Sequence, residues 1–361
     1  MMNPYNPQML PLRNGQVHYA AFVEELIDAT AKLEVYKEKI RDSKLDSSWF
    51  MPTLQQKEAL ASSKLEGTQA TLDGVLSYQA MPDAEDENLN EVLNYNTATV
   101  RGYKLLLKDK FSDEFFCELH KALMDGNVRK QGDIGSYRTH QNYIGRNDIS
   151  HAITFTPPAP QKVPELMTNL IDYINEPSDN FRPLVRAAII HAQFETIHPF
   201  GDGNGRVGRM LIPMYLFAAR QIELPCFFIS EALEHNKIKY YTLLNDTRKK
   251  ENWDEWIKFF LNAVTAQCEK YIGIVSAINS LYDRDLSSAC EATKSQHAIV
   301  VMNTLYKFPV TTSKQMQKET GLPPASLNRI LNVLVEKNIL YTNNKHRNRT
   351  FYYYDLLEII R

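Results

Sequence analysis

Apolar side chains recur along most of the chain with a spacing near 3.6 residues, which is the period of an amphipathic helix. The pattern predicts helices over Gln16–Ile40 and Gln56–Lys64, separated by Pro52. We therefore expect a mainly α fold. Further helices are predicted over Glu91–Lys108, Asp113–Met124, Val163–Ile174, Pro183–Ile197, Gly205–Ala219, Asn236–Asp246 and Asp254–Leu281.

Residues 132–160 interrupt this helical pattern. Glycines stand at turn positions, β-branched and aromatic residues alternate over short stretches, and three prolines close the segment. This composition favours a short β-hairpin that projects from the helical body. On local pattern alone, an ordinary surface loop is the alternative.

A second module is expected after Tyr282, because residues 283–295 have the polar composition of a linker. Two helices follow over 312–336 around a glycine-containing turn, and two β-like stretches then span Ile339–Thr342 and Thr350–Tyr354. This order is typical of a winged helix-turn-helix. The expected regions are an N-terminal helical region at 1–90, a catalytic domain at 91–282 and a winged helix at 283–361.

The charges are segregated along the chain. The 361 residues include 41 Lys and Arg against 43 Asp and Glu, a net charge of −2, which gives no general attraction to nucleic acid or anionic lipid. Residues 295–361, however, hold nine basic and four acidic side chains. Lys345, Arg347 and Arg349 lie in the expected wing, so this module is predicted to bind DNA or a protein.

Targeting signals are absent from the pattern. Met1–Leu12 contains three prolines and no apolar run, and the longest strongly apolar stretch, Met210–Ala219, is ten residues long. A spanning helix needs roughly 20 such residues. The four cysteines form no C-x-x-C motif, which suits a reducing compartment. We expect a soluble cytoplasmic protein with no membrane partner.

The most informative segment is HPFGDGNGRVGR, which spans His198–Arg209. Gly201, Gly203 and Gly205 occupy alternate positions and permit a positive φ, so successive N–H groups can form a concave nest for an anion. A predicted helix begins immediately afterwards, and its free N–H groups and positive dipole end favour phosphate at the same place.

Four side chains in this segment carry chemistry. Arg206 and Arg209 lie three residues apart on the first helical turn, so both can reach one polyphosphate. Asp202 would repel phosphate by itself, which suggests that it recruits Mg²⁺. His198 stands at the edge of the loop, where a neutral imidazole can take the proton of an attacking hydroxyl. A helix-capping histidine is the alternative.

Three other motifs fit less well. The glycines at 203–208 satisfy G-x-G-x-x-G, but a long helical pattern precedes them instead of a strand. A Walker loop requires Lys-Ser/Thr after its last glycine, and here Arg209 follows. Glu195 and His198 form one Glu-x-x-His motif, whereas a di-iron bundle needs two.

The segment resembles the Fic family signature H-P-F-x-[D/E]-G-N-G-R-x-x-R at all nine constrained positions. The resemblance extends over residues 62–261 and includes the later IKYYTLL segment. It implies a Fic helical bundle with a β-hairpin flap. It also implies transfer of AMP from ATP to a Ser, Thr or Tyr hydroxyl of a protein, with release of pyrophosphate.

The resemblance implies roles for individual residues. His198 would be the general base and Asp202 the Mg²⁺ ligand. Tyr240 and Tyr241 match positions that line the adenosine side of the nucleotide, although two core tyrosines are the alternative. Residues 141–158 match the flap, on which the protein substrate docks by strand addition. The phosphates would be held by Gly203, Asn204, Gly205, Arg206 and Arg209, of which Arg209 binds the γ-phosphate.

A second family motif lies upstream. Ser62-Ser63-Lys64-Leu65-Glu66-Gly67 fits the inhibitory pattern [S/T]-x-x-x-E-[G/N]. The Glu66 carboxylate would form a bidentate pair with Arg209 and take the place of the γ-phosphate, so that ATP binds unproductively. Ser62 would support the loop or cap and is assigned no chemistry.

The leading hypothesis is a protein adenylyltransferase that is inhibited by its own Glu66 and uses ATP and Mg²⁺. A nucleotide-sensing regulator that binds DNA through residues 295–361 is the alternative from another class. Within the enzyme class, the site is also compatible with transfer of UMP or another group, or with removal of AMP from a modified protein. The sequence leaves the target, the release of inhibition, and the choice between monomer and homodimer open.

Overall fold

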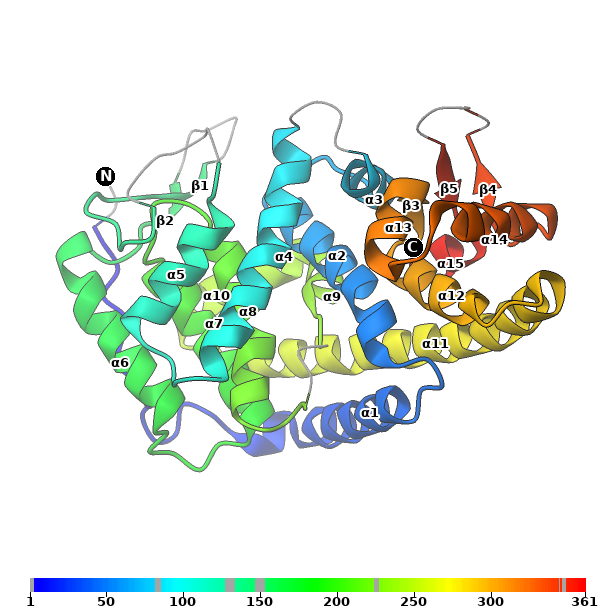
Figure 1. Ribbon diagram of the computed structural model, residues 1–361. Coiled ribbons are helices and arrows are strands. Elements are labelled where there is room, and N and C mark those ends of the chain that lie inside the picture. Colours follow the sequence, from blue (N-terminus) through cyan, green and yellow to red (C-terminus); the bar gives the residue numbers. More distant parts are fainter. Residues whose placement is uncertain are drawn as a thin grey trace. The chain divides into compact units, whose positions relative to one another are not determined.

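The computed structural model describes residues 3–81, 86–126, 134–146, 153–223, 227–343, 345 and 349–361. Helices make up most of the chain, so the expected mainly α class is confirmed (Figure 1). Within the described residues, no helix combines the length and apolar character needed to cross a membrane. The chain folds into two compact units. The first unit consists of residues 1–33, 61–67 and 94–267, and the second consists of residues 34–60, 68–93 and 268–361.

Four long helices contribute residues to both units. They are α1 (Val23–Arg41), α2 (Ser47–Leu65), α4 (Glu87–Leu106) and α11 (Trp253–Thr293). The first unit also contains short 3-10 turns at Tyr19–Ala21 and Pro160–Lys162. Its own helices are α5 (Asp113–Leu123), α6 (Val163–Asn175), α7 (Pro183–Ile197), α8 (Asn204–Ala218), α9 (Ser230–His235) and α10 (Lys237–Lys250).

Helix α7 is the centre of the first unit, since every residue over 184–197 is buried. Its sequence is apolar on nearly all sides, and a helix of this kind needs neighbours around its whole circumference. Among the described elements, α7 packs most extensively on α8, and it also contacts α6 and α10 (Figure 1). The glycine-rich loop joins α7 to α8, so the best-packed pair of helices positions the site.

The expected hairpin is present in the first unit. Strand β1 (Ile144–Arg146) pairs antiparallel with β2 (Ile153–Phe155), and Ile144 lies opposite Phe155. The middle of the predicted flap, residues 147–152, lies outside the described residues.

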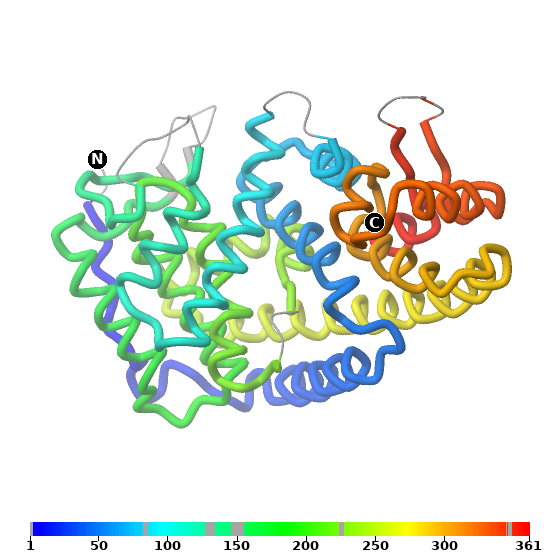
Figure 2. Tube along the Cα trace, viewed as in Figure 1, coloured from blue at the N-terminus to red at the C-terminus, as the bar shows by residue number. Residues whose placement is uncertain are grey.

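The second unit ends in a compact group of helices and strands, drawn from orange to red in Figure 2. Its sheet has the order β3-β5-β4, and all neighbouring strands are antiparallel. The turn after α13 contains Gly321, whose φ of 68° explains the glycine there. The elements of this group are α12 (His297–Lys307), β3 (Val310–Thr312), α13 (Ser313–Thr320), α14 (Pro324–Glu336), β4 (Tyr341–Thr342), β5 (Thr350–Tyr352) and α15 (Tyr354–Ile360). Helix α3 (Leu72–Ala80), from earlier in the chain, packs on β3.

Two local predictions are wrong. Residues 283–293 are not a linker but the end of α11. Asp285 and Ala289 are buried on one face of this helix, and the polar composition of the segment gives no sign of that face. Asp285 accepts a hydrogen bond of 2.7 Å from the Tyr353 hydroxyl. Pro52 does not separate the first two helices but lies inside α2, and the break falls at 42–46. The three-region division of the chain stays a prediction.

Candidate active site

The glycine-rich loop is closed by its own side chains. His198 ends α7 in the left-handed conformation, with φ of 52°, and its N–H donates to the Phe194 carbonyl at 2.9 Å. The Asn204 side chain then binds both backbone groups of Phe200, donating to its carbonyl and accepting from its N–H, each at 2.8 Å. These hydrogen bonds within the loop hold its backbone in a defined shape.

Two of the glycines are required for different reasons. Gly203 alone of the three predicted nest glycines has a positive φ, of 74°. Gly205 needs no unusual backbone, but a Cβ there would overlap the Glu66 carboxylate. Gly201 and Gly205 therefore do not use the positive φ that glycine permits, and Gly205 is explained by close approach of a side chain.

The loop presents two arginines and one carboxylate. Arg206 and Arg209 are both buried on the first turns of α8. Asp202 is half exposed, and its Oδ2 lies 3.8 Å from Arg206 Nη2 while its Oδ1 accepts the Gly203 N–H at 2.6 Å. No group of three or more metal-binding side chains occurs in the described part of the chain. The half-exposed carboxylate of Asp202 is a hard oxygen donor of the kind that divalent cations prefer.

The predicted contact between Glu66 and Arg209 is formed. Arg209 is 1% exposed, and its Nη2 lies 2.6 Å from Glu66 Oε1. The pair is not bidentate, because only Nη2 reaches the carboxylate. Ser62 accepts from the same guanidinium through its Oγ, at 2.8 Å from Nε, and its carbonyl, at 2.9 Å from Nη2. Ser62 thus binds the guanidinium directly instead of acting only as a cap.

Helix α10 holds the end of α2 beside this pair. Lys237 Nζ donates to the Leu65 carbonyl at 2.8 Å, and the Tyr241 hydroxyl donates to the same oxygen at 3.4 Å. Tyr240 is fully buried, and its hydroxyl lies 2.9 Å from His191 Nε2. Because His191 Nδ1 faces the Gly208 carbonyl, Nδ1 donates and Nε2 accepts from Tyr240. Tyr240 is therefore an interior residue, whereas Tyr241 is half-buried beside Leu65.

The charges at the site suit a carboxylate and a neutral imidazole. Burial acts to raise the pKa of Glu66. The positive charges of Arg209 and Arg206 together outweigh burial, so the pKa of Glu66 is lowered. Burial lowers the pKa of His198 to about 3, and the positive charge of Arg248 acts in the same direction. His198 Nδ1 has no hydrogen-bond partner among the described residues. His198 is therefore neutral at physiological pH.

Two residues that the sequence analysis did not single out hold the loop. Arg138 donates to the carbonyls of His198 at 2.8 Å and Pro158 at 2.6 Å, and its own N–H donates to Pro199. A cation at the carbonyl end of α7 also complements the helix dipole. No local signal marks Arg138, because its partners lie far away in the sequence.

His120, on α5, is the second such residue. Its Nδ1 accepts the Gly135 N–H at 3.0 Å, so its Nε2 donates to the Asp202 carbonyl at 3.2 Å. Its ring stacks on Phe200 with 4.0 Å between the centroids. Burial lowers the pKa of His120 to about 4, which keeps this ring neutral.

The chain matches known families in two adjoining regions. Residues 23–104 match the Fic/DOC family N-terminal region, and residues 110–216 match the Fic/DOC family itself. A buried helix pair that carries a glycine-rich loop with a flap beside it is the architecture of this class. The chain belongs to the Fic/DOC family.

Curated relatives are protein adenylyltransferases. The chain is similar to protein adenylyltransferase fic-1 of Caenorhabditis elegans, with 28% identity over 203 residues, which is 55% of this chain and 36% of that protein. A probable protein adenylyltransferase of Aquifex aeolicus is 22% identical over 216 residues, covering 55% of this chain and 64% of that one. The chain thus spans about a third of the length of the first of these relatives.

Solved structures support the fold. A Fic family protein from Desulfovibrio desulfuricans G20 aligns with a TM-score of 0.61 and 19% identity, covering 97% of this chain and 98% of that one. A Fic domain signalling protein from Bacteroides thetaiotaomicron aligns with a TM-score of 0.57 and 18% identity, covering 70% of this chain and 97% of that one.

Proposed function

We propose that this chain is a protein adenylyltransferase that Glu66 holds in an inhibited state. The observation that carries the proposal is the Glu66–Arg209 contact of 2.6 Å at the loop that also bears the neutral His198. The names of the curated relatives support AMP transfer to a protein. The three free cysteines among the described residues accord with the reducing cytoplasm that we propose as its location.

ATP is the proposed nucleotide substrate. Its phosphates would lie against the N-terminus of α8, with backbone N–H groups of Gly203, Asn204 and Gly205 and the guanidinium groups of Arg206 and Arg209 as partners. Asp202 would hold Mg²⁺, which supplies positive charge to the phosphates when it is bound. Tyr241 is the better candidate to contact the adenosine part of ATP, and the ring of buried Tyr240 packs against the Tyr241 ring.

The reaction needs one base and one oriented acceptor. The hydroxyl oxygen of the target forms a bond to the α-phosphorus of ATP, and the bond between that phosphorus and the bridging oxygen of pyrophosphate breaks. The hydroxyl proton passes to the neutral imidazole of His198, and the electron pair leaves with pyrophosphate. The flap, residues 141–158, would hold the backbone of the target by strand addition, which brings the hydroxyl to the base.

Inhibition follows from competition for one side chain. Arg209 donates from Nε to Ser62 and from Nη2 to Ser62 and Glu66, so the Glu66 carboxylate competes with a γ-phosphate for Nη2. A triphosphate would then bind with its α-phosphorus out of line with the attacking hydroxyl. Displacement of Glu66 frees Nη2 for the γ-phosphate and aligns the α-phosphorus.

The test compares labelling by ATP and Mg²⁺ in four proteins: wild type, Glu66→Gly, the double variant Glu66→Gly/His198→Ala, and Lys64→Ala. Lys64 is an exposed residue of the same helix end and serves as the matched control. We expect Glu66→Gly to label itself or proteins of a lysate at least about tenfold more than wild type, with the label lost when His198 is also changed. Lys64→Ala should behave as wild type.

Each component of the proposal has its own contrary outcome. Equal labelling by wild type and Glu66→Gly would remove the inhibitory role of Glu66. Full labelling by the double variant would remove His198 as the base. Mass spectrometry of the labelled peptide distinguishes AMP from UMP or another group, and loss of AMP from a pre-modified protein would identify the reverse reaction.

A second candidate function concerns the end of the chain. The order α12, β3, α13, α14, β4, β5 supports a winged helix-turn-helix in residues 295–361. Arg349 lies 2.7 Å from Asn332 on α14, Lys345 is exposed, and Arg347 lies outside the described residues. DNA binding by the full chain should weaken with salt and with Lys345→Glu. Salt-independent retention on DNA, or binding only to a protein, would remove DNA as the partner.

A further inference from the structure

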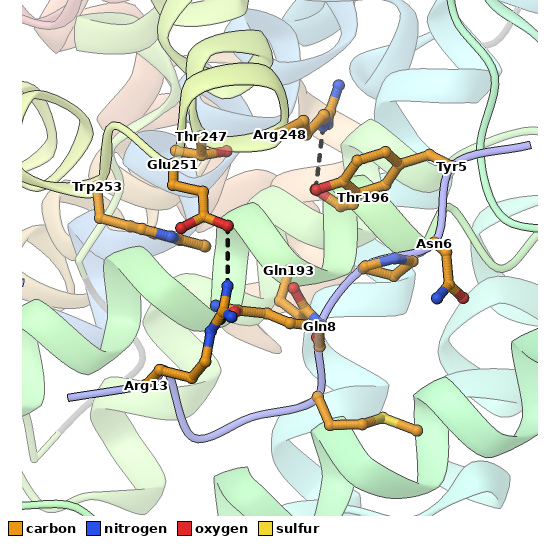
Figure 3. A pocket seen from close by; sticks show the side chains of 12 residues that line it. Tyr5, Asn6, Gln8, Arg13, Gln193, Thr196, Thr247, Arg248, Glu251 and Trp253 are labelled. Carbon is orange, nitrogen blue, oxygen red and sulfur yellow. Dashed lines mark hydrogen bonds and ion pairs between the residues drawn. The ribbon is translucent and has the colours of Figure 1, made fainter. Parts of the chain in front are cut away.

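Arg248, on α10, contacts two functional segments of the first unit. Its Nε donates to Thr196 Oγ1 at 3.0 Å, two residues before His198 on α7. The carbon at the centre of its guanidinium lies 4.1 Å from the ring centroid of Phe155, the last residue of β2 in the flap. Figure 3 shows Arg248 directed at Thr196, with Tyr5 beside them. One side chain therefore touches both the flap and the helix end that carries the base.

Arg248 is a half-buried cation that makes no ion pair among the described residues. Its remaining hydrogen bond is to the Asn245 side chain at 3.1 Å. The nearby Glu251 pairs instead with Arg13, at 2.9 Å (Figure 3). Burial lowers the pKa of Arg248 to about 10, so it remains charged at neutral pH. Its position is therefore set by Thr196, Asn245 and the Phe155 ring, and not by an ion pair among the described residues.

The flap end is held from a second side by the N-terminal segment. Phe155 is buried, and the Tyr5 ring packs on it at 5.6 Å between centroids. The Tyr5 N–H donates to the Thr156 carbonyl at 3.0 Å, just beyond β2. A cavity of about 470 Å³ adjoins this contact and is lined by Tyr5, Thr196 and Arg248 among others. Phe155 is thus held by contacts with Tyr5 and Arg248. The cavity beside these contacts leaves the far side of Tyr5 and Arg248 loosely packed.

The link to His198 is both mechanical and electrostatic. Thr196 donates its hydroxyl hydrogen to the Ala192 carbonyl at 2.7 Å, so its oxygen is free to accept from Arg248. The charged groups that act on His198 are Arg248 and Arg138, which disfavour the imidazolium, and Glu66, which favours it. Arg248 therefore acts on the base through the last turn of α7 and through its charge.

We propose that Arg248 is a positioning residue that ties the flap to the end of α7, so that a target strand held on the flap is placed in register with His198. The catalytic consequence rests on the proposed adenylyltransferase function. The physical link between flap, Arg248 and His198 does not, and it is measurable without turnover.

The first experiment uses the full chain without substrate. Arg248→Lys keeps the charge but loses the planar group that stacks on Phe155, and Arg248→Met loses both. We expect amide exchange in residues 153–156 to be about two- to fivefold faster in both variants. NMR titration of His198 should show a pKa raised by roughly 0.5–1 unit in Arg248→Met and nearly unchanged in Arg248→Lys, because the removed charge repels the imidazolium.

Lys249→Met is the matched control, because Lys249 is the next residue on α10 and is exposed. It should leave both the exchange and the titration unchanged. If exchange in residues 153–156 and the titration of His198 are the same in all three variants as in wild type, the proposal is overturned. A general rise in exchange across α7 and α8, with a lower melting temperature, would also overturn it by showing a merely structural role.

The second experiment repeats the comparison with activity, in the Glu66→Gly background. We expect Arg248→Lys to raise the KM for the protein target about three- to tenfold without changing the KM for ATP. Arg248→Met should in addition move the acid limb of the pH–rate profile to higher pH. Equal increases in both KM values contradict the proposal. If Glu66→Gly itself is inactive, the adenylyltransferase function fails, while exchange and titration still decide the role of Arg248.

Discussion

Glu195 shows how far the buried end of α7 departs from ordinary side-chain chemistry. The residue is 7% exposed, and its Oε1 has no hydrogen-bond partner among the described residues. Burial raises its pKa to about 7; Arg209 opposes this shift and the charge of Glu66 adds to it. The folded protein therefore binds a proton that the unfolded chain releases at lower pH, and this difference makes stability depend on pH.

The sign of this dependence gives the first prediction. The pKa of Glu195 is higher in the folded protein than its ordinary value of 4.5, so stability falls as the pH rises from about 4.5 to about 7. Glu195→Gln removes the ionisation. We expect the variant to lose about 2–3 kcal/mol less stability than wild type between pH 5 and pH 8, measured as the free energy of unfolding in urea. The same loss in both proteins would contradict the assigned pKa.

At the scale of elements, the site depends on the close approach of α7 and α8. Gly208 faces Glu195 across the two helices, and a Cβ there would overlap the Glu195 carboxylate and lie 3.1 Å from Phe194 Cδ1. Both neighbours are buried, so neither has room to move away. The glycine at this position of the motif is therefore explained by packing.

The second prediction follows from this contact. Gly208→Ala should destabilise the protein by about 1–3 kcal/mol through overpacking, seen as a lower midpoint in urea unfolding. Gly273→Ala is the control, because Gly273 lies in α11 with open space around it. That change should stabilise the protein by about 0.5–1 kcal/mol through helix propensity alone. Similar effects of the two substitutions would show that the α7–α8 approach is not tight.

The elements also show what could be predicted from the sequence. The loop at 198–209 could be placed because local signals suffice: a helix, a proline, spaced glycines and a new helix follow one another. The end of α11 could not, because the polar run 283–293 is helical only through burial of particular residues such as Asp285. Helix propensity is a weak prior that tertiary contacts override.

The residues that hold the loop in place could not be predicted from local sequence patterns, for a related reason. Arg138 and His120 hold the loop from positions about 60 and 80 residues earlier in the chain. A hydrogen bond between such distant residues leaves no periodicity or spacing in the sequence. The same holds for Ser62, which was expected to support the loop or cap and which binds Arg209 together with Glu66. The motifs predicted that Glu66 contacts Arg209, and the structure gives the hydrogen bonds by which this contact is made.

For the whole molecule, the residues of the candidate site all belong to the first compact unit, including the short stretch 61–67 that carries Glu66. The contact between Glu66 and Arg209 therefore contributes to the stability of that unit. Arg209 is almost completely buried, and removal of Glu66 leaves its Nη2 with only the Ser62 carbonyl. An unpaired buried charge is strongly destabilising, so loss of the Glu66 carboxylate is expected to cost stability when no nucleotide is present.

The third prediction uses this coupling in a thermal melt of the full chain. Without ligand, Glu66→Gly should melt several degrees below wild type, because Arg209 loses its carboxylate. With Mg²⁺ and ATP, the variant should gain more than wild type, by about 1.4 kcal/mol for each tenfold difference in affinity, because the γ-phosphate replaces that carboxylate. AMP has no γ-phosphate and should raise both melting temperatures equally. If ATP gives equal gains in the two proteins, Glu66 and the γ-phosphate do not compete for Arg209, and the inhibition must act at another step.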